Sequence, residues 1–393
     1  MIKKLLSLSI YRPLLQMPPL CHLLRALRAK EAKNEQEMLG ALGELCAFLA
    51  QNGTADSLPT AVLTAVQGLN NPYAQALASG KPISKAVRTN ALRDLETLYL
   101  AATVPYSCFG DGAPYYGRAL PDAPFDAPWH TVSAAWEQFH RQNGCGPFAL
   151  HNAFVWQGGA VHAVRESDPI RLSSLKGYPV QRKILIDNTE AFLRGAPANH
   201  ILLYGDRGTG KSSSVKALLH EYAHKGLRII QIPKEELLTL PALTEQLADI
   251  PCRFLLFVDD LSFKTDDDRI SSLKAVLEGG LACQPSNVLI YATSNRLHLV
   301  RESDRNGAER RAADTVQEEI SLSDRFGITL TFLLPDRVRF FEIVEAIAAE
   351  NGLDIEREKL LAAAERWATE HGGRSPRYAR QFVQDLCAKG GVL

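Results

Sequence analysis

The chain has 393 residues, 46% of them hydrophobic, and its 44 basic and 44 acidic side chains give a net charge of zero. This length predicts roughly two or three domains, and the balanced charge gives no general sign of a nucleic-acid or membrane partner. Seven scattered cysteines without a Cys-x-x-Cys pair argue against a disulfide framework or zinc ribbon and favour a reducing, cytoplasmic location, and no apolar run is long enough to cross a bilayer.

Residues 1–104 are predicted to form a helical N-terminal domain. Residues 35–50 and 84–102 repeat apolar side chains every three to four positions, which is the spacing of one helix face. The first 33 residues carry seven basic side chains against Glu31 as the one acidic residue. They form either a basic helix that touches anionic lipid or nucleic acid or, as we favour, the solvated face of an amphipathic helix. No function of this domain is predicted from its residues.

Residues 105–165 are predicted to be a connecting region. Its first part, residues 105–128, is rich in proline, glycine and aromatic side chains and is typical of an ordered loop. The aromatic rings are either a platform for a nucleic acid base or packed against the helical domain. We favour packing, because Arg118 is the only basic residue among them. A helix is expected between Trp129 and Gly146, followed by extended or mixed structure over residues 148–164.

Residues 166–334 are predicted to form an α/β nucleotide-binding domain. From Asp168 onward, strands alternate with helices, which predicts a parallel sheet. A helix over residues 180–193 is expected to precede a first strand at 201–204. The later strands are expected at residues 227–231, 254–258, 288–293 and 328–332.

Residues 205–212, Gly-Asp-Arg-Gly-Thr-Gly-Lys-Ser, fit the phosphate-loop pattern G-x-x-x-x-G-K-[ST] between the first strand and a helix. The glycines let backbone amides surround phosphate oxygens, and the start of the helix adds the positive end of its dipole. Lys211 is expected to reach the β- and γ-phosphates, and the hydroxyl of Ser212 is expected to hold Mg²⁺. The predicted nucleotide-binding residues here are Gly205, Asp206, Arg207, Gly208, Thr209, Gly210, Lys211, Ser212 and Ser213.

Two later strands end in polar residues. Asp259 and Asp260 follow an apolar run, so the first is suited to hold Mg²⁺ through water and the second to orient or deprotonate an attacking water. The alternative for this pair is a helix cap. Asn295, with Thr293 as second candidate, is expected to touch the γ-phosphate and the water; the alternative is a simple turn residue.

Two arginines complete the predicted site. Arg325, before the fifth strand, is interpreted as an arginine finger for a neighbouring subunit, with an ion pair to Asp324 or another neighbour as the alternative. Residues 335–393 are predicted to be a helical lid, with helices near 338–350, 355–370 and 375–387. Arg377, on the first turn of the last helix, is expected to fold down on the nucleotide. Arg374 is the alternate, and a solvated charge at a helix start is the alternative for both.

Together these pieces resemble the AAA+ ATPases. The segments 188–195, 202–219, 259–263, 277–281, 290–295 and 321–327 resemble one bacterial branch of that class, known only as domain of unknown function 815. The resemblance covers roughly residues 145–390. It implies a five-stranded parallel sheet in AAA+ order, a helical lid, and residues 175–178, among them Leu175, Gly177 and Tyr178, near the adenine. It assigns nucleotide, metal or catalytic roles to Lys211, Ser212, Asp259, Asp260, Asn295, Arg325 and Arg377.

The chain departs from the AAA+ pattern in two places. Asp260 is usually a glutamate in AAA+ proteins, and its shorter side chain leaves slow hydrolysis as an alternative. The loop over residues 233–251 has neither the aromatic residue nor the glycine that threading motors usually carry. Peptide threading is therefore disfavoured.

The sequence thus predicts an ATPase that binds ATP with Mg²⁺, hydrolyses ATP at the interfaces of a homo-oligomer, and remodels or loads a protein or nucleoprotein partner. The alternative is a slow nucleotide-dependent switch that recruits a partner. A small-molecule kinase is a third interpretation, against which the Asp259–Asp260 pair, the lid and Arg325 all weigh. A GTPase is disfavoured because the chain has no Asn-Lys-x-Asp motif. Basic residues are spread rather than striped, so a nucleic-acid partner has little support.

Overall fold

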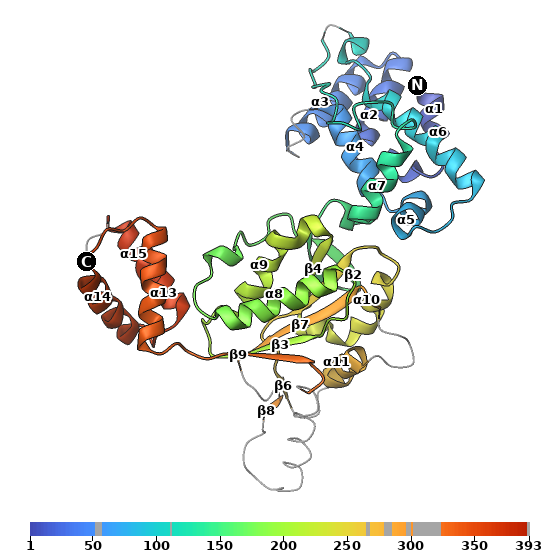
Figure 1. Cartoon of the computed structure of the whole chain (residues 1–393). Helices are drawn as coiled ribbons and strands as arrows, with labels where there is room; N and C mark the ends of the chain where they lie inside the picture. The colour runs from blue at the N-terminus through green and yellow to red at the C-terminus, as the bar shows by residue number, and fades with distance from the viewer. Residues whose placement is uncertain are drawn as a thin grey trace. The chain divides into compact units, whose positions relative to one another are not determined.

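The computed structural model describes residues 1–51, 57–110, 112–264, 268–278, 285–295, 300–301 and 324–390. The chain divides into two compact units, Met1–His151 with Asp249–Cys252, and Asn152–Ala248 with Arg253–Leu393 (Figure 1). The expected connecting region, 105–165, is therefore shared between the two units. Its first part belongs to the helical unit, and its last part belongs to the sheet of the second unit.

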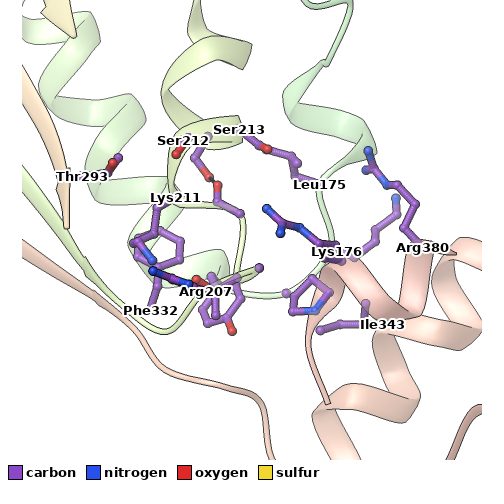
Figure 2. A pocket seen from close by; sticks show the side chains of 18 of the residues that line it. Leu175, Lys176, Arg207, Lys211, Ser212, Ser213, Thr293, Phe332, Ile343 and Arg380 are labelled. Atoms are coloured by element: carbon purple, nitrogen blue, oxygen red, sulfur yellow. Dashed lines mark hydrogen bonds between the residues drawn. The ribbon is translucent and has the colours of Figure 1, made fainter. Parts of the chain in front are cut away.

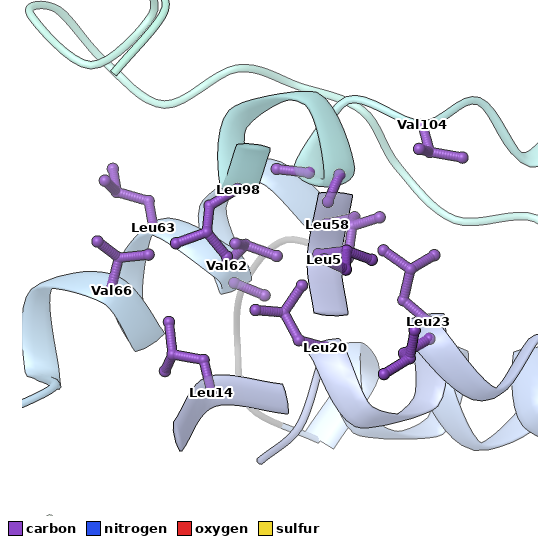
Figure 3. Close-up of a cluster of buried hydrophobic side chains, with 14 of the residues drawn as sticks. Leu5, Leu14, Leu20, Leu23, Leu58, Val62, Leu63, Val66, Leu98 and Val104 are labelled. Atoms are coloured by element: carbon purple, nitrogen blue, oxygen red, sulfur yellow. The ribbon is translucent and has the colours of Figure 1, made fainter. Parts of the chain in front are cut away.

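The first unit is a helical domain around one apolar core. Buried leucine, valine and alanine side chains of several helices meet in this core, as Figure 3 shows for Leu5, Leu20 and Val62. Local signals set the helix ends: Ser57, Asn71 and Ser84 accept hydrogen bonds from backbone amides of the first turns that follow them. The helices are α1 (Ile2–Leu6), η1 (Arg12–Gln16), α2 (Leu20–Glu31), α3 (Glu35–Gln51), α4 (Leu58–Gly68), α5 (Pro72–Ser79), α6 (Lys85–Ala102), η2 (Tyr106–Phe109), α7 (Ser133–Asn143) and η3 (Gly146–Ala149).

The aromatic residues of the loop after α6 pack into this core. Tyr116 is buried and donates from its hydroxyl to the carbonyl oxygen of Val104 at 2.9 Å. The ring of Phe125 lies edge-on to the ring of Trp136, with centroids 4.7 Å apart. These contacts agree with packing rather than with a platform for a nucleic acid base, although Tyr115 remains 70% exposed.

The second unit is built on a seven-stranded sheet in the order β2-β1-β4-β5-β7-β3-β9. Five of its parallel strands match the five predicted ones and confirm the predicted nucleotide-domain core. Numbered along the chain, these five stand in the order 2-3-4-1-5, which is the AAA+ order. The strands are β3 (Ile201–Gly205), β4 (Leu227–Gln231), β5 (Arg253–Val258), β7 (Val288–Ser294) and β9 (Ile328–Phe332).

The sheet has two strands beyond the five that were predicted, and both lie within residues 148–164, which were expected to be extended or mixed. A hairpin of β1 (Ala153–Gln157) and β2 (Ala160–Ala163) extends the sheet, with β1 parallel to β4 and antiparallel to β2. Gly158 and Gly159 form its turn at φ of +58° and +75°, a conformation that glycine adopts without strain. Phe154 and Trp156 are buried on one face of β1, which anchors the hairpin. A separate two-stranded sheet pairs β6 (Phe263–Lys264) with β8 (Val300–Arg301).

The helices that were predicted in the second unit begin and end within about two residues of their predicted positions. Residues 234–247, within the expected loop over 233–251, are instead helical, and the helix at 268–278 was not predicted. Asp336 accepts a hydrogen bond from the backbone amide of Arg339, and Ser375 accepts one from Tyr378, so both cap lid helices. The lid has an apolar core of its own around Phe340. No helix among the described residues is long and apolar enough to span a membrane. The helices are η4 (Leu172–Ser174), α8 (Pro179–Leu193), α9 (Lys211–Tyr222), η5 (Ala223–Lys225), η6 (Lys234–Thr239), α10 (Leu240–Leu247), α11 (Asp268–Glu278), α13 (Arg337–Glu350), α14 (Arg357–Glu370) and α15 (Pro376–Ala388).

Candidate nucleotide-binding site

A cavity of about 670 Å³ lies where the parallel strands end at the phosphate loop. Figure 2 shows Lys211, Ser212 and Ser213 at the start of α9, with Ile343 and Arg380 on lid helices. This volume is in the range of small-molecule sites. The predicted residues that line it are Leu175, Lys176, Gly177, Tyr178, Arg207, Gly208, Thr209, Gly210, Lys211, Ser212, Ser213, Asp259, Asp260, Thr293, Asn295 and Arg377.

Close packing against β9 explains why the phosphate loop begins with glycine. Gly205 has a φ of +135°, and a Cβ atom there would lie 2.1 Å from the carbonyl oxygen of Phe332. The next residue, Asp206, donates its backbone N–H to that same oxygen at 2.9 Å. Gly205 and Asp206 were predicted to bind nucleotide, but neither is among the residues that line the cavity. Both instead contact β9 and fix the start of the phosphate loop.

Lys211 lies buried at the first position of α9. Its ammonium group donates to the carbonyl oxygens of Gly205 at 2.8 Å and Asp206 at 2.7 Å, and to Oδ1 of Asn295 at 3.2 Å. Burial lowers the pKa of Lys211, and the nearby carboxylates, Asp206 first, oppose that shift. The contacts hold a cation where the loop and the start of α9 would receive phosphate oxygens.

The polar strand ends are brought together in one hydrogen-bonded network. Oδ1 of Asp259 accepts from the hydroxyls of Ser212 and Thr293, each at 2.6 Å. The hydroxyl of Thr293 in turn accepts from the backbone amide of Asp260 at 2.9 Å. Oδ1 of Asp260 accepts from the side-chain amide of Asn295 at 2.7 Å. Thr293 is therefore a positioning residue for both aspartates, whereas Asn295 joins Asp260 to Lys211.

The Ser212 and Asp259 oxygens fit a magnesium site. They are hard hydroxyl and carboxylate donors, 2.6 Å apart, beside a loop shaped for phosphate. Mg²⁺ is typically bound by one or two protein oxygens, with substrate phosphates and waters as its other ligands. The donor set alone supports this fit, and Mg²⁺ would neutralise phosphate charge there.

Asp260 has a strained backbone and a second charged partner. Its φ of +53° is uncommon for a residue other than glycine, although aspartate tolerates this region better than most. Its Oδ2 atom lies 3.5 Å from Nζ of Lys234, which also donates to the hydroxyl of Ser262 at 3.3 Å. In this conformation the carboxylate faces Asn295 on one side and Lys234 on the other.

The loop that the AAA+ resemblance assigns to the adenine meets the lid. A Cβ atom at Gly177, which has a φ of +78°, would lie 2.9 Å from Cδ1 of Ile343 on α13. Arg380 on α15 donates to the carbonyl oxygen of Ser174 at 2.8 Å, and Arg182 on α8 donates to that of Leu175. Burial lowers the pKa of the Arg182 guanidinium.

Several lining residues escaped the sequence analysis. Arg380 follows Arg377 by three positions and so shares its helix face, a signal that was present in the sequence. The lid and loop residues have no such signal, because long-range packing brings them to the cavity. The missed residues are Arg182, Ser214, Phe332, Ile343, Ile347, Pro376, Arg380, Gln381 and Gln384.

The lid arginines left open by the sequence differ in their surroundings. Arg377 lines the cavity, and its backbone amide donates to the carbonyl oxygen of Gly208 at 3.1 Å. Arg374 instead forms an ion pair with Glu365, and that hydrogen bond lowers the pKa of the Glu365 carboxyl. Arg374 is not among the lining residues.

Arg325 is not among the lining residues and is half-buried in the turn that precedes β9. Residues 279–281 and 321–323, which carry part of the sequence resemblance, lie outside the described part of the chain.

The strand order, the phosphate loop after β3, the acidic end of β5 and the helical lid define the AAA+ class of P-loop folds. Residues 149–390 match the family described as "Protein of unknown function (DUF815)", and the chain belongs to this family. No curated protein matches the chain.

Three solved structures illustrate what the chain resembles. The Thermotoga maritima RuvB Holliday junction branch migration motor is 18% identical at a TM-score of 0.40, and the match spans 56% of this chain and 65% of that one. A DNA replication initiation factor and the FIGL-1 AAA domain in complex with ADP are each 19% identical at a TM-score of 0.37. Each match spans 57% of this chain, with 66% of the initiation factor and 74% of the FIGL-1 domain covered. At these values the similarities establish no activity or partner for this chain.

Proposed function

We propose that the chain is a magnesium-dependent ATPase that hydrolyses ATP at sites shared between subunits and uses the energy to remodel or load a protein or nucleoprotein partner. The observation that carries this proposal is the strand-end network beside the phosphate loop. It joins Lys211 through Asn295 to Asp260, and Ser212 to Asp259.

Each member of the network has a role in this reaction. Lys211 and the loop amides bind the β- and γ-phosphates, and Ser212 and Asp259 would hold Mg²⁺, which neutralises phosphate charge. Asp260 and Asn295 orient the attacking water. The water oxygen bonds to the γ-phosphorus as the bond to the β–γ bridging oxygen breaks, and Asp260 accepts the proton.

The position of Arg325 supports hydrolysis sites that are shared between subunits. It does not line the cavity of its own chain, so a direct role in hydrolysis requires the cavity of a neighbouring copy. A guanidinium supplied in that way stabilises the charge of the transition state and leaves a single chain with an incomplete site.

The second candidate function is a slow switch that binds ATP, recruits a partner and hydrolyses little. The pairing of Asp260 with Lys234 favours it, because a carboxylate engaged by an ammonium and an amide must rearrange before it takes a proton from water. Turnover per subunit separates the two functions. The third candidate, a small-molecule kinase, is tested by phosphate transfer to an added acceptor.

The direct test is ATP binding and phosphate release by the full chain with Mg²⁺ and with Lys211→Met. This variant keeps the aliphatic stem and removes the buried cation. We expect at least about tenfold weaker ATP binding and no measurable turnover, since charge-assisted contacts to phosphate are lost. Lys183→Met, which removes an exposed lysine of α8, is the matched control. Unchanged binding by Lys211→Met would contradict the proposal.

A further inference from the structure

The link between β9 and the lid is held by two polar contacts rather than by burial. Leu333 and Leu334 form the start of this link, and their side chains are 59% and 44% exposed. Oδ2 of Asp206 accepts a hydrogen bond from the backbone amide of Leu334 at 2.7 Å. On the residue before it, the hydroxyl of Tyr178 donates to the carbonyl oxygen of Leu333 at 2.5 Å.

The first contact originates in the phosphate loop. Asp206 is bound through three groups at once: its amide donates to Phe332, its carbonyl oxygen accepts from Lys211, and its carboxylate accepts from Leu334. The carbonyl contact to Lys211 is 2.7 Å long. Movement of the Lys211 ammonium toward a phosphate therefore acts on the same residue that holds the start of the lid link.

The second contact originates in the loop beside α13. Tyr178 has a φ of +52°, a strained conformation for an aromatic residue, which persists only where neighbouring contacts enforce it. Its ring lies against Phe332 with centroids 5.0 Å apart, and it follows Gly177, which packs on Ile343. The residue lines the cavity as well as holding the link.

We propose that Asp206 and Tyr178 form a two-point clamp that couples nucleotide occupancy of the cavity to the position of the lid. Both act as positioning residues through Leu333 and Leu334. The coupling half of this proposal rests on the proposed function, because nucleotide is the ligand that would displace the two loops. The mechanical half, that the two side chains hold the link, does not.

The mechanical half is tested by amide hydrogen exchange of peptides that cover residues 333–336 in the nucleotide-free full chain. Asp206→Ala is expected to speed exchange of the Leu334 amide about tenfold, because its acceptor is lost. Tyr178→Phe, which keeps the ring, is expected to speed exchange in the same peptides. Asp206→Asn retains an acceptor oxygen and is expected to restore protection. Asp187→Ala and Tyr222→Phe, which remove comparable groups elsewhere in this unit, are the controls.

The coupling half is tested by the distance between a probe near the end of α8 and one on α14, whose described residues do not line the cavity. With ATP and Mg²⁺ the wild-type distance is expected to shift, and Asp206→Ala and Tyr178→Phe are expected to lose about half of the shift or more. The clamp is overturned if both variants exchange the Leu334 amide at the wild-type rate. It is also overturned if the probe distance shifts as far in both variants as in the wild type. Absence of nucleotide binding by the wild type refutes the proposed function instead, and the exchange data still decide the mechanical half.

Discussion

At the residue scale, the two aspartates at the end of β5 have different tasks although they are adjacent. Asp259 is tied to Ser212 and Thr293, which suits a ligand fixed in place, whereas Asp260 contacts Asn295 and Lys234. The sequence pattern placed both carboxylates at the sheet edge. Lys234 was absent from that prediction, because its approach depends on the turn after β4 and not on any local motif.

We predict that Asp260→Asn binds ATP as tightly as the wild type, within about threefold, but loses hydrolysis by a factor of about 10² or more, the range for a general base. Asparagine has the same shape and also tolerates a positive φ, so the fold is retained. Phosphate release and nucleotide affinity are the measurements, and Asp268→Asn on α11 is the control. Turnover near the wild-type rate would remove Asp260 from the mechanism.

A second prediction concerns the stability of the second unit at alkaline pH. Burial lowers the pKa of Lys211 in the folded chain below its ordinary value of 10.5, so the unfolded chain binds more protons between these two pKa values. The free energy of unfolding of the wild type, relative to that of Lys211→Met, must therefore rise as pH approaches 10.5. Denaturant unfolding of both proteins between pH 7 and about 10.5 measures this difference. A constant or falling difference would contradict the assigned direction.

At the element scale, local signals predicted the helices and the parallel strands well. The lid illustrates why: Ser375 was predicted as the cap of the last helix, and it accepts a hydrogen bond from the amide of Tyr378. Features that depend on distant partners were not predicted. The β1–β2 hairpin joins the sheet beside β4, and Gly177 meets Ile343, which lies far along the chain.

The junction of β3 with the phosphate loop gives a third prediction. Gly205→Ala forces a Cβ atom to 2.1 Å from the Phe332 carbonyl oxygen, so it should destabilise the second unit by about 2 kcal/mol or more. Gly40→Ala, in the interior of α3 with nothing near its Cβ position, should stabilise the first unit by about 0.5–1 kcal/mol. Unfolding curves of the two variants are the test, and equal effects would contradict this packing.

At the scale of the whole molecule, the candidate site is more complete than the sequence alone predicted on the lid side. On the lid side the cavity is lined by Arg377, Arg380 and Ile343, among others, and of these three only Arg377 was expected. Arg325 is the predicted catalytic residue that lies outside it. The sequence pattern placed Arg325 before the fifth strand, but the role proposed for it requires a second copy of the chain, which no local pattern contains.

Hydrolysis at sites shared between subunits is the central part of the proposed function. The most direct test measures ATP turnover per subunit as protein concentration rises, for the wild type, Arg325→Ala and the control Arg194→Ala. We predict that the wild-type and Arg194→Ala rates per subunit climb with concentration, while Arg325→Ala still binds ATP but falls by about 10³-fold, as expected for a lost arginine finger. A rate per subunit that is independent of concentration and of Arg325 would contradict hydrolysis at shared sites.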